Sequence, residues 1–447
     1  MASEMSEQPF LLTSLPLPLP QRIFLRLPVD QRGRACCVCR AWRDALADPE
    51  LWTQLDLTEE SGVVIYRLRD AQLLRGAAAR AQGRLHTLDV RFTYREWSHD
   101  MEPALLEVLT ANTASLRVLR VRTLRLPLVD YGDDSVCALA LLNAAPRLER
   151  LDADVSCNAV DMLHLMRGEA PWDLLARPLR IQSLEVIIET NDAVPAVAAV
   201  LADATLQPAL STVVFSFAHI TEPPVLDALV DGLLARHTVR ALELGCCTQP
   251  AAAPLARLLA GGALTTLKVN VLWNRAHTAL FDEAGAALVA DALRANTTLT
   301  TLEFKKANLC EDVAAACTVL GALVGHPSLS ELVLWNEVPP AEGHAALGAA
   351  LAALVTADAP ALEYMEIINV DLGGASLEPF VNALRRNRHL RKLRFSPNGL
   401  SEEFKGGELL PVIRANSGLQ LLLCYPDPAD PVITEAMKLV ADRAQRS

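Results

Sequence analysis

A short apolar pattern recurs along most of this chain and constrains its fold more than any other feature. The pattern is apolar-x-x-apolar-x-apolar, first at Leu85, Leu88 and Val90 and last at Leu419, Leu422 and Cys424. The copies between them begin at Leu116, Leu148, Ile181, Leu210, Val239, Leu264, Leu299, Leu329, Leu362 and Leu390. The mean spacing is about 30 residues, which indicates a solenoid of stacked structural units.

Each unit combines two periodicities. The final apolar-x-apolar alternates as a short strand does, and places both side chains on one face. Between the strands lie helical stretches such as 283–296, where Ala287, Leu288, Asp291, Ala292 and Ala295 recur at three- and four-residue spacing. One such unit cannot bury its own apolar face. We therefore expect an α/β solenoid with parallel strands on the concave face, helices on the convex face and a continuous core between them.

Composition excludes several classes of protein. With 51% hydrophobic residues the 447-residue chain has ample apolar surface for a core, and its net charge of −12 argues against nucleic acid or an anionic membrane as a partner. The opening residues are acidic where a signal peptide is basic, and the apolar stretch from Ala345 to Ala357 is too short to span a bilayer. The ten cysteines form no disulfide framework, so we expect a cytoplasmic or nuclear protein.

The repeats resemble the leucine-rich-repeat family, in its long ribonuclease-inhibitor-like form. The segment with Leu390, Leu393, Phe395, Asn398 and Leu400 matches the full family pattern, including its asparagine. Most other copies lack that asparagine, so the loops after their strands are less predictable than the strands.

Residues 14–57 follow a different pattern. They contain two Leu-Pro pairs, an Ile-Phe pair, a Val-Cys-x-x-Trp segment and a closing Leu-Trp. Proline and aspartate residues begin short helices here, and a unit this small has apolar side chains that it cannot bury alone. The order and spacing resemble the F-box. Pro18 and Pro20 depart from that pattern, so we expect the first helix to start at Pro20.

The F-box resemblance implies docking to a Skp-type adaptor, and through it to a cullin-type (SCF-like) ubiquitin ligase. The adaptor contacts implied by position are Leu15, Pro16, Ile23, Phe24, Leu27, Pro28, Val38, Trp42, Leu51 and Trp52. An F-box followed by leucine-rich repeats is the arrangement of a substrate-recognition subunit. The chain would then be a monomer within the complex and would bind a target protein through its repeats.

These features predict five regions. They are a flexible N-terminus at 1–13, an F-box at 14–57, a helical connector and N-terminal cap at 58–84, about 12 repeats at 85–425, and a C-terminal capping helix at 426–447. We expect the repeats to form one solenoid without an internal boundary.

No residue cluster indicates catalysis, a cofactor or a metal. Cys36 and Cys39 have Cys-x-x-Cys spacing, but no second pair lies at a zinc-site distance. Asp152 and Asp154 lie on one face of a strand and could bind a cation, although solvated carboxylates on the concave face are the simpler interpretation. There is no glycine-rich phosphate loop. We predict a non-catalytic protein.

Two functions remain open. One is the ubiquitin-ligase adaptor. The other is an interaction scaffold, ribonuclease-inhibitor-like or GTPase-regulator-like, whose N-terminal motif only caps the solenoid. Exposure of Ile23, Phe24, Trp42 and Trp52 favours the first, because a cap would bury them against the first repeat.

Side chains beside the buried strand positions should face the concave surface. Near the C-terminal end they include apolar residues with charged neighbours, which is the composition of a binding surface. The predicted target-binding residues are Val333, Trp335, Tyr364, Ile368, Leu423 and Tyr425, with Lys305 and Arg394. Two alternatives stay open: the C-terminal segment covers this patch, or the target binds near Arg120 and Arg122.

Overall fold

The structure is a computed structural model that describes most of the chain. The described residues are 24, 26–27, 29–38, 40–57, 69–90, 101–125, 136–137, 144–145, 147–167, 179–188, 190–217, 223–246, 252–261, 263–271, 279–336, 344–370, 374–396, 400–424 and 430–444. The chain divides into two compact units, Met1–Leu184 and Glu185–Ser447.

The first unit begins with short helices and continues as strand–helix repeats. Its helices are α2 (Val29–Ala35), α3 (Arg40–Ala45), the 3-10 helix η2 (Pro49–Trp52), α4 (Arg69–Ala81), α5 (Met101–Ala111) and α7 (Ala159–Arg167). Its strands are β1 (Gln54–Asp56), β2 (Thr87–Val90), β3 (Val118–Arg125), β4 (Val136–Cys137) and β5 (Arg150–Asn158). β1, β2, β3 and β5 pair in parallel in chain order, and the short β4 pairs with β3. Strand β6 (Leu179–Ile188) crosses the division between the units.

The second unit repeats one strand and one helix with little variation. Its strands are β7 (Thr212–Phe217), β8 (Ala241–Cys246), β9 (Thr266–Val271), β10 (Thr301–Lys305), β11 (Glu331–Trp335), β12 (Tyr364–Ile368), β13 (Lys392–Phe395) and β14 (Leu421–Cys424). Its helices are η4 (Asn191–Ala193), α9 (Val194–Ala202), α10 (Pro223–Ala235), α11 (Ala252–Ala260), α12 (Glu283–Ala295), α13 (Val313–Ala322), α14 (His344–Thr356), α15 (Gly374–Leu384), α16 (Glu402–Phe404), the π-helix η5 (Lys405–Leu409), α17 (Leu410–Ala415) and α18 (Pro431–Ala444).

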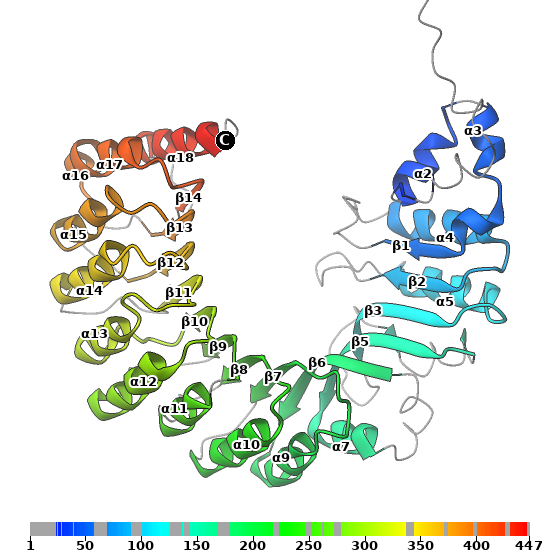
Figure 1. Ribbon diagram of the computed structural model, residues 1–447, viewed down its shortest axis with the longest axis horizontal. Coiled ribbons are helices and arrows are strands. Elements are labelled where there is room, and N and C mark those ends of the chain that lie inside the picture. Colours follow the sequence, from blue (N-terminus) through cyan, green and yellow to red (C-terminus); the bar gives the residue numbers. More distant parts are fainter. Residues whose placement is uncertain are drawn as a thin grey trace, which may run out of the picture. The chain divides into compact units, whose positions relative to one another are not determined.

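Neighbouring strands of the second unit all pair in parallel, from β7 to β14. The helices cover one face of this sheet and leave the other face open, as Figure 1 shows. The α/β leucine-rich-repeat architecture expected from the sequence is therefore confirmed. Each of the twelve predicted repeats contributes a strand at the predicted place.

The alternation within each strand separates core from open face. In β10, Leu302 and Phe304 are buried beneath the helices, and Leu302 lies in register with Leu267 of β9 and Leu332 of β11. The repeated leucines therefore form continuous rows across the sheet. These rows stabilise neighbouring repeats together, because each leucine loses its solvent contact only when the next repeat is folded.

The structure adds one repeat that the sequence analysis missed. Trp52, Leu55 and Leu57 have the same apolar-x-x-apolar-x-apolar spacing, and all three are buried. They place β1 in parallel register beside β2, with Leu55 paired to Leu88. The pattern escaped notice because Trp52 also closes the F-box-like segment. The last residues of that segment are thus already part of the first repeat.

Helix α12 shows how the sequence sets the ends of a repeat helix. Asp282 is its N-cap and accepts a hydrogen bond from the Gly285 backbone N–H at 2.7 Å. The helix ends at Ala295 with Asn296 as its C-cap, in close agreement with the predicted range of 283–296. Alanine-rich helices of this kind pack closely. At Gly348, for example, a Cβ atom would lie 1.9 Å from the Ser376 carbonyl oxygen, so only glycine fits.

Buried asparagines link successive repeats at one position, three residues before the first buried residue of the strand pattern. Asn296 accepts a hydrogen bond from the Leu299 N–H at 2.8 Å and donates one to the Leu259 carbonyl of the preceding helix at 2.7 Å. Asn387 and Asn416 do the same in their repeats. Each asparagine thus satisfies a turn N–H and a carbonyl near the end of the preceding helix. His326 and Arg236 occupy the same position in other repeats.

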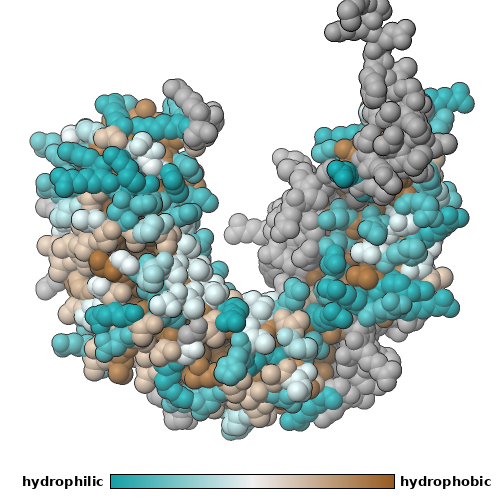
Figure 2. Space-filling model, viewed as in Figure 1, coloured by the Kyte–Doolittle hydropathy of each residue, from teal (hydrophilic) through white to brown (hydrophobic). Residues whose placement is uncertain are grey.

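The helical layer of the second unit changes in character along the chain. Figure 2 shows mostly neutral and hydrophobic residues over α13 and α14, and mainly hydrophilic residues over α16 to α18. The sequences agree, since α13 and α14 contain no Asp, Glu, Lys or Arg. The unit ends with α18, whose Ile433, Ala436 and Val440 are buried. None of the described helices is both long and apolar enough to cross a membrane.

Candidate functional site

The short helices at residues 29–52 surround a small aromatic core. The Phe24 and Trp42 rings meet edge to face with centroids 5.6 Å apart. The Trp52 indole N–H donates to the Leu46 carbonyl at 2.8 Å. η2 begins at Asp48, which accepts a hydrogen bond from the Glu50 N–H at 3.0 Å, and Pro49 follows the cap. These local signals hold a closing turn that buries Leu51 and Trp52.

Arg32 ties this segment together from α2. Its guanidinium donates to the Leu51 carbonyl at 2.7 Å and to the Leu27 carbonyl at 2.8 Å. Burial lowers the pKa of Arg32, although arginine stays charged at any ordinary pH. A charged donor satisfying two carbonyls makes stronger hydrogen bonds than a neutral one, so Arg32 fixes α2 against the closing turn.

The structure changes the role expected for several predicted adaptor contacts. Phe24, Leu51 and Trp52 are buried within the chain, so they support the segment's shape and offer no surface to a partner. Trp52 also contacts α4, with the Arg80 guanidinium 5.2 Å from its ring centre. Phe24 and Trp52 therefore do not meet the exposure criterion that favours adaptor docking over a cap. The physical reason is that Trp52 is also the first buried position of repeat one, while Phe24 packs against Trp42.

Other predicted contacts do face outward. Val38 is 63% exposed at the end of the turn after α2, and Leu27 and Trp42 are half-buried. Leu15, Pro16, Ile23 and Pro28 lie outside the described residues, as does the helix expected to start at Pro20. Val38 is a large apolar side chain in water on a segment with a well-packed interior. Val38 is therefore accessible to a partner, whereas the buried Phe24 and Trp52 are not.

A row of alternating charges crosses the open face of the first unit. Asp89, Arg120 and Asp152 lie in register on β2, β3 and β5. The Arg120 guanidinium lies 3.4 Å from the Asp89 carboxylate and 3.2 Å from that of Asp152, and Arg150 lies 2.8 Å from Asp152. The two carboxylates therefore balance the positive charge of Arg120. This weakens the alternative prediction that the target binds near Arg120 and Arg122. The side chains of Arg122 and Asp154 lie outside the described residues.

Asp152 is not placed to hold a metal ion. Its carboxylate accepts from two guanidinium groups, which occupy the oxygen lone pairs that a cation needs. Cys36 is buried as a free thiol, and Cys39 lies outside the described residues. Across the described part of the chain, no group of three or more His, Cys, Asp or Glu side chains could bind a metal.

The predicted target-binding patch is smaller than expected. Val333 is only 4% exposed and Ile368 is fully buried, so neither presents the aliphatic surface expected of them. Val333 lies in register between Glu303 and Glu366, whose longer side chains flank it, and Ile368 lies beside Trp335. Trp335 and Tyr364 are half-buried, whereas Leu423 is 42% exposed. Tyr425 lies outside the described residues.

The charged members of this patch are paired with carboxylates. Lys305 lies 2.5 Å from Glu303 and Arg394 lies 3.0 Å from Glu366. The Tyr364 hydroxyl also donates to Glu366, and burial together with this hydrogen bond raises the pKa of Tyr364. The patch is thus a hydrogen-bonded surface with two half-buried aromatic rings. Its role in target binding stays a prediction.

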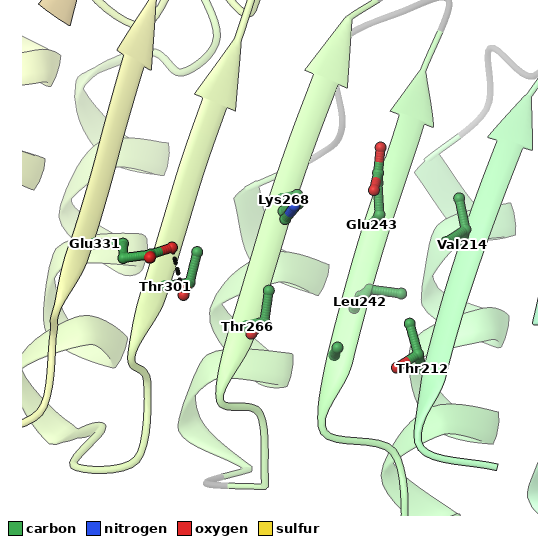
Figure 3. A pocket seen from close by; sticks show the side chains of 9 residues that line it. Thr212, Val214, Leu242, Glu243, Thr266, Lys268, Thr301 and Glu331 are labelled. Carbon is green, nitrogen blue, oxygen red and sulfur yellow. Dashed lines mark hydrogen bonds between the residues drawn. The ribbon is translucent and has the colours of Figure 1, made fainter. Parts of the chain in front are cut away.

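A pocket on the open face of the second unit was not anticipated from the sequence. It has a volume of about 330 Å³ and crosses five strands, from β7 to β11 (Figure 3). Its lining residues are Thr212, Val214, Ala241, Leu242, Glu243, Thr266, Lys268, Thr301 and Glu331. Glu243 and Lys268 occupy the middle position of their apolar-x-apolar strands, so the repeat pattern already marked them as open-face residues.

Glu243 is the carboxylate of this pocket that lacks a partner. Glu331 accepts a hydrogen bond from the Thr301 hydroxyl at 3.3 Å, and Lys268 lies 3.7 Å from Glu303. Glu243 forms no hydrogen bond or ion pair within the described residues. Burial raises the pKa of Glu243; the charges of Lys268 and Lys305 oppose this shift, while the neighbouring carboxylates of Glu303 and Glu185 add to it. The site holds a partly desolvated negative charge without a matching cation in contact.

Comparison with known proteins agrees with this geometry at the N-terminus. The F-box-like family model matches residues 12–58, against the 14–57 predicted from the spacing. No curated protein matches the chain by sequence. Residues 12–58 are therefore an F-box-like domain, and the strand–helix repeats after it form a leucine-rich-repeat fold.

Two solved structures are similar at low identity. The leucine-rich repeat-containing protein LegL7 from Legionella pneumophila is 13% identical, with 80% of this chain and 98% of that chain covered and a TM-score of 0.36. The complex of Rad7 and Elc1 from yeast gives 11% identity, coverage of 86% and 90%, and a TM-score of 0.39.

Proposed function

We propose that this chain is a non-catalytic substrate-recognition adaptor of a cullin-type ubiquitin ligase. The F-box-like domain docks a Skp-type adaptor, and the open face of the repeats binds a target protein. The observation that carries the proposal is an F-box-like domain joined to leucine-rich repeats, with the apolar Val38 exposed on that domain. Cysteines that remain free thiols in the described residues fit a cytoplasmic or nuclear site of action.

Val38 offers a clean test, because it is exposed and its substitution leaves the aromatic core intact. Val38→Asp places a charge where the adaptor would exclude water, and it should weaken binding to a purified Skp-type adaptor about tenfold or more. Trp42→Ala should add to the loss, in part by removing the edge-to-face contact with Phe24, so its folding is checked by its thermal midpoint. Affinities are measured by surface plasmon resonance with the full chain. Phe24→Ala is less informative, since it empties the segment's own core.

Val160→Asp is the matched control. Val160 is 54% exposed on α7, outside the F-box-like domain, so the same charge should leave adaptor binding unchanged. Adaptor binding that survives Val38→Asp combined with Trp42→Ala would refute docking through this surface.

A scaffold function is the second candidate, and one observation favours it. Trp52 is buried against α4, as expected of a motif that caps the solenoid. Burial of Trp52 is compatible with adaptor docking through Val38, because the two side chains serve different contacts. Failure of the unaltered chain to bind any Skp-type adaptor would leave the scaffold as the function.

A further inference from the structure

The pocket around Glu243 has a charge pattern that selects its ligand. Glu331 is hydrogen-bonded to Thr301, and Lys268 and Lys305 both contact Glu303. Glu243 is a half-buried carboxylate in register with Lys268, and the charges of Lys268 and Lys305 oppose those of Glu303 and Glu185 around it. Neither lysine forms an ion pair with Glu243, because both contact Glu303. A ligand that brings a positive charge to Glu243 would gain a charge-assisted hydrogen bond in a partly desolvated site.

The remaining lining suits a long side chain with a polar end. Val214 and Ala241 flank Glu243 on the neighbouring strand and on its own strand, and they provide apolar wall. The half-buried Thr212 and Thr266 place hydroxyl groups along the same wall, able to accept hydrogen bonds from N–H donors (Figure 3). Lysine and arginine have this composition, since their methylene stems lie on apolar surface while the charged head reaches a polar partner.

The pocket is large enough to hold one long side chain. Pockets that enclose a whole small molecule have volumes of about 300–1,000 Å³, and this pocket, at about 330 Å³, lies at the lower limit. Its lining residues come from the strands, whose open face the helices leave uncovered (Figure 1). A side chain projecting from a docked protein can therefore enter it without any rearrangement of the strands.

We propose that this pocket receives a lysine or arginine side chain of the target protein, with Glu243 as its counter-ion. The inference rests on the proposed function, in which the open face binds the target. It moves the centre of recognition from β11–β14 to β7–β11. An acidic or phosphorylated ligand fits poorly, because Glu243 and Glu331 would face it and Lys268 is already shared with Glu303.

The test measures binding of four small probes to the full chain by NMR of methyl-labelled Val, Ala and Thr residues. The probes are the N-acetyl N-methylamides of lysine, arginine, norleucine and glutamate. Lysine and arginine should shift the methyl signals of Val214, Ala241 and Thr266. Norleucine has the stem without the charge and should bind about tenfold more weakly, and glutamate should not bind.

Two substitutions in the pocket should change lysine binding in opposite directions, which tests the role assigned to Glu243. Glu243→Gln keeps the side-chain shape and should weaken lysine binding about tenfold, whereas Lys268→Met removes a competing cation and should strengthen it about twofold to fivefold. Glu378→Gln, at an exposed position of helix α15 away from the pocket, is the control for an equal charge change, and it should alter lysine binding by less than about twofold. Equal thermal midpoints of the variants confirm that each is folded.

Three results would overturn the proposal: lysine binding unaffected by Glu243→Gln, norleucine binding equal to lysine, or preferential binding of glutamate. The adaptor assay separates this failure from failure of the proposed function. Glu243→Gln lies outside the F-box-like domain and should leave Skp-type adaptor binding unchanged. Probe binding without adaptor binding would keep the pocket and refute the ligase role.

Discussion

His326 occupies the position of the buried asparagines and makes the same kind of turn hydrogen bond with an imidazole ring. It stands where Asn296, Asn387 and Asn416 stand in their repeats, three residues before the first buried residue of the strand pattern. Its Nδ1 atom accepts from the backbone N–H groups of Ser328 at 3.4 Å and Leu329 at 3.2 Å. Nδ1 must therefore be unprotonated, and the ring is neutral in the folded chain.

This arrangement predicts acid sensitivity at one repeat. Burial lowers the pKa of His326, and the nearby carbonyls of Asn296 and Leu293 oppose that shift only in part. An unfolded histidine has a pKa of about 6.5, so below that pH the unfolded chain binds a proton that the folded chain does not. His326 therefore leaves stability unchanged above about pH 7.5 and destabilises the fold as pH falls through 6.5, by at most about 1.4 kcal/mol per pH unit.

His326→Asn should remove this acid-dependent loss, because asparagine fills the same position elsewhere without titrating. Urea unfolding of both proteins between about pH 5.5 and 7.5 measures the difference, which should grow as pH falls. The exposed His237→Asn is the control for loss of one histidine. Parallel stability curves for His326→Asn and the unaltered chain would contradict the prediction.

At the scale of elements, the leucine rows carry the stability. Leu302 on β10 is fully buried and lies in register between Leu267 and Leu332, so it belongs to three repeats at once. Leu288 on the adjoining helix α12 is 51% exposed. Leu302 falls in the strand pattern; Leu288 falls in the helical periodicity of 283–296, but the structure places its side chain on the exposed face of α12.

Leu302→Ala should destabilise the second unit by about 2–5 kcal/mol, from lost apolar burial and the cavity that remains. Leu288→Ala should change stability by less than about 0.5 kcal/mol, because its side chain is largely hydrated in both states. Urea unfolding followed by circular dichroism compares the two. Similar effects of the two substitutions would show that the strand leucines do not carry the core.

At the scale of the whole molecule, the F-box-like domain and the repeats share residues. Trp52 closes the first and opens the pattern of the second, and β1 follows it directly. The division between the two compact units falls within β6, a strand whose Leu179, Ile181, Leu184, Val186 and Ile188 are buried. A strand is a poor protease site, because cleavage needs several residues of extended, accessible backbone.

Limited proteolysis should therefore spare residues 179–188 and cut first outside the strands and helices. We expect no stable fragment that begins or ends within β6, which is the prediction of repeats without an internal domain boundary. Mass spectrometry of the early fragments identifies the cuts. An early cut in β6 that releases a folded piece of the repeats would establish a boundary there.

The sequence by itself determined the repeat, the strand positions and the F-box-like segment. Those follow from local periodicity and short-range spacing, which act whatever the neighbours are. The leucine pattern located β2 to β14 apart from β4, and the helical periodicity of 283–296 located α12. These positions can be predicted because residues at the same place in each repeat are buried or exposed alike.

Only the tertiary structure decided which side chains remain available for binding. Val333 and Ile368 occupy open-face positions in the pattern but lose their exposure to longer neighbours on adjacent strands. Glu243 is left without a partner because Lys268 contacts Glu303 on the far side. Trp52 is buried because two patterns coincide on it. Each outcome depends on side chains of adjacent strands, which are about 30 residues apart in the sequence. No short sequence pattern shows which of these side chains contact each other.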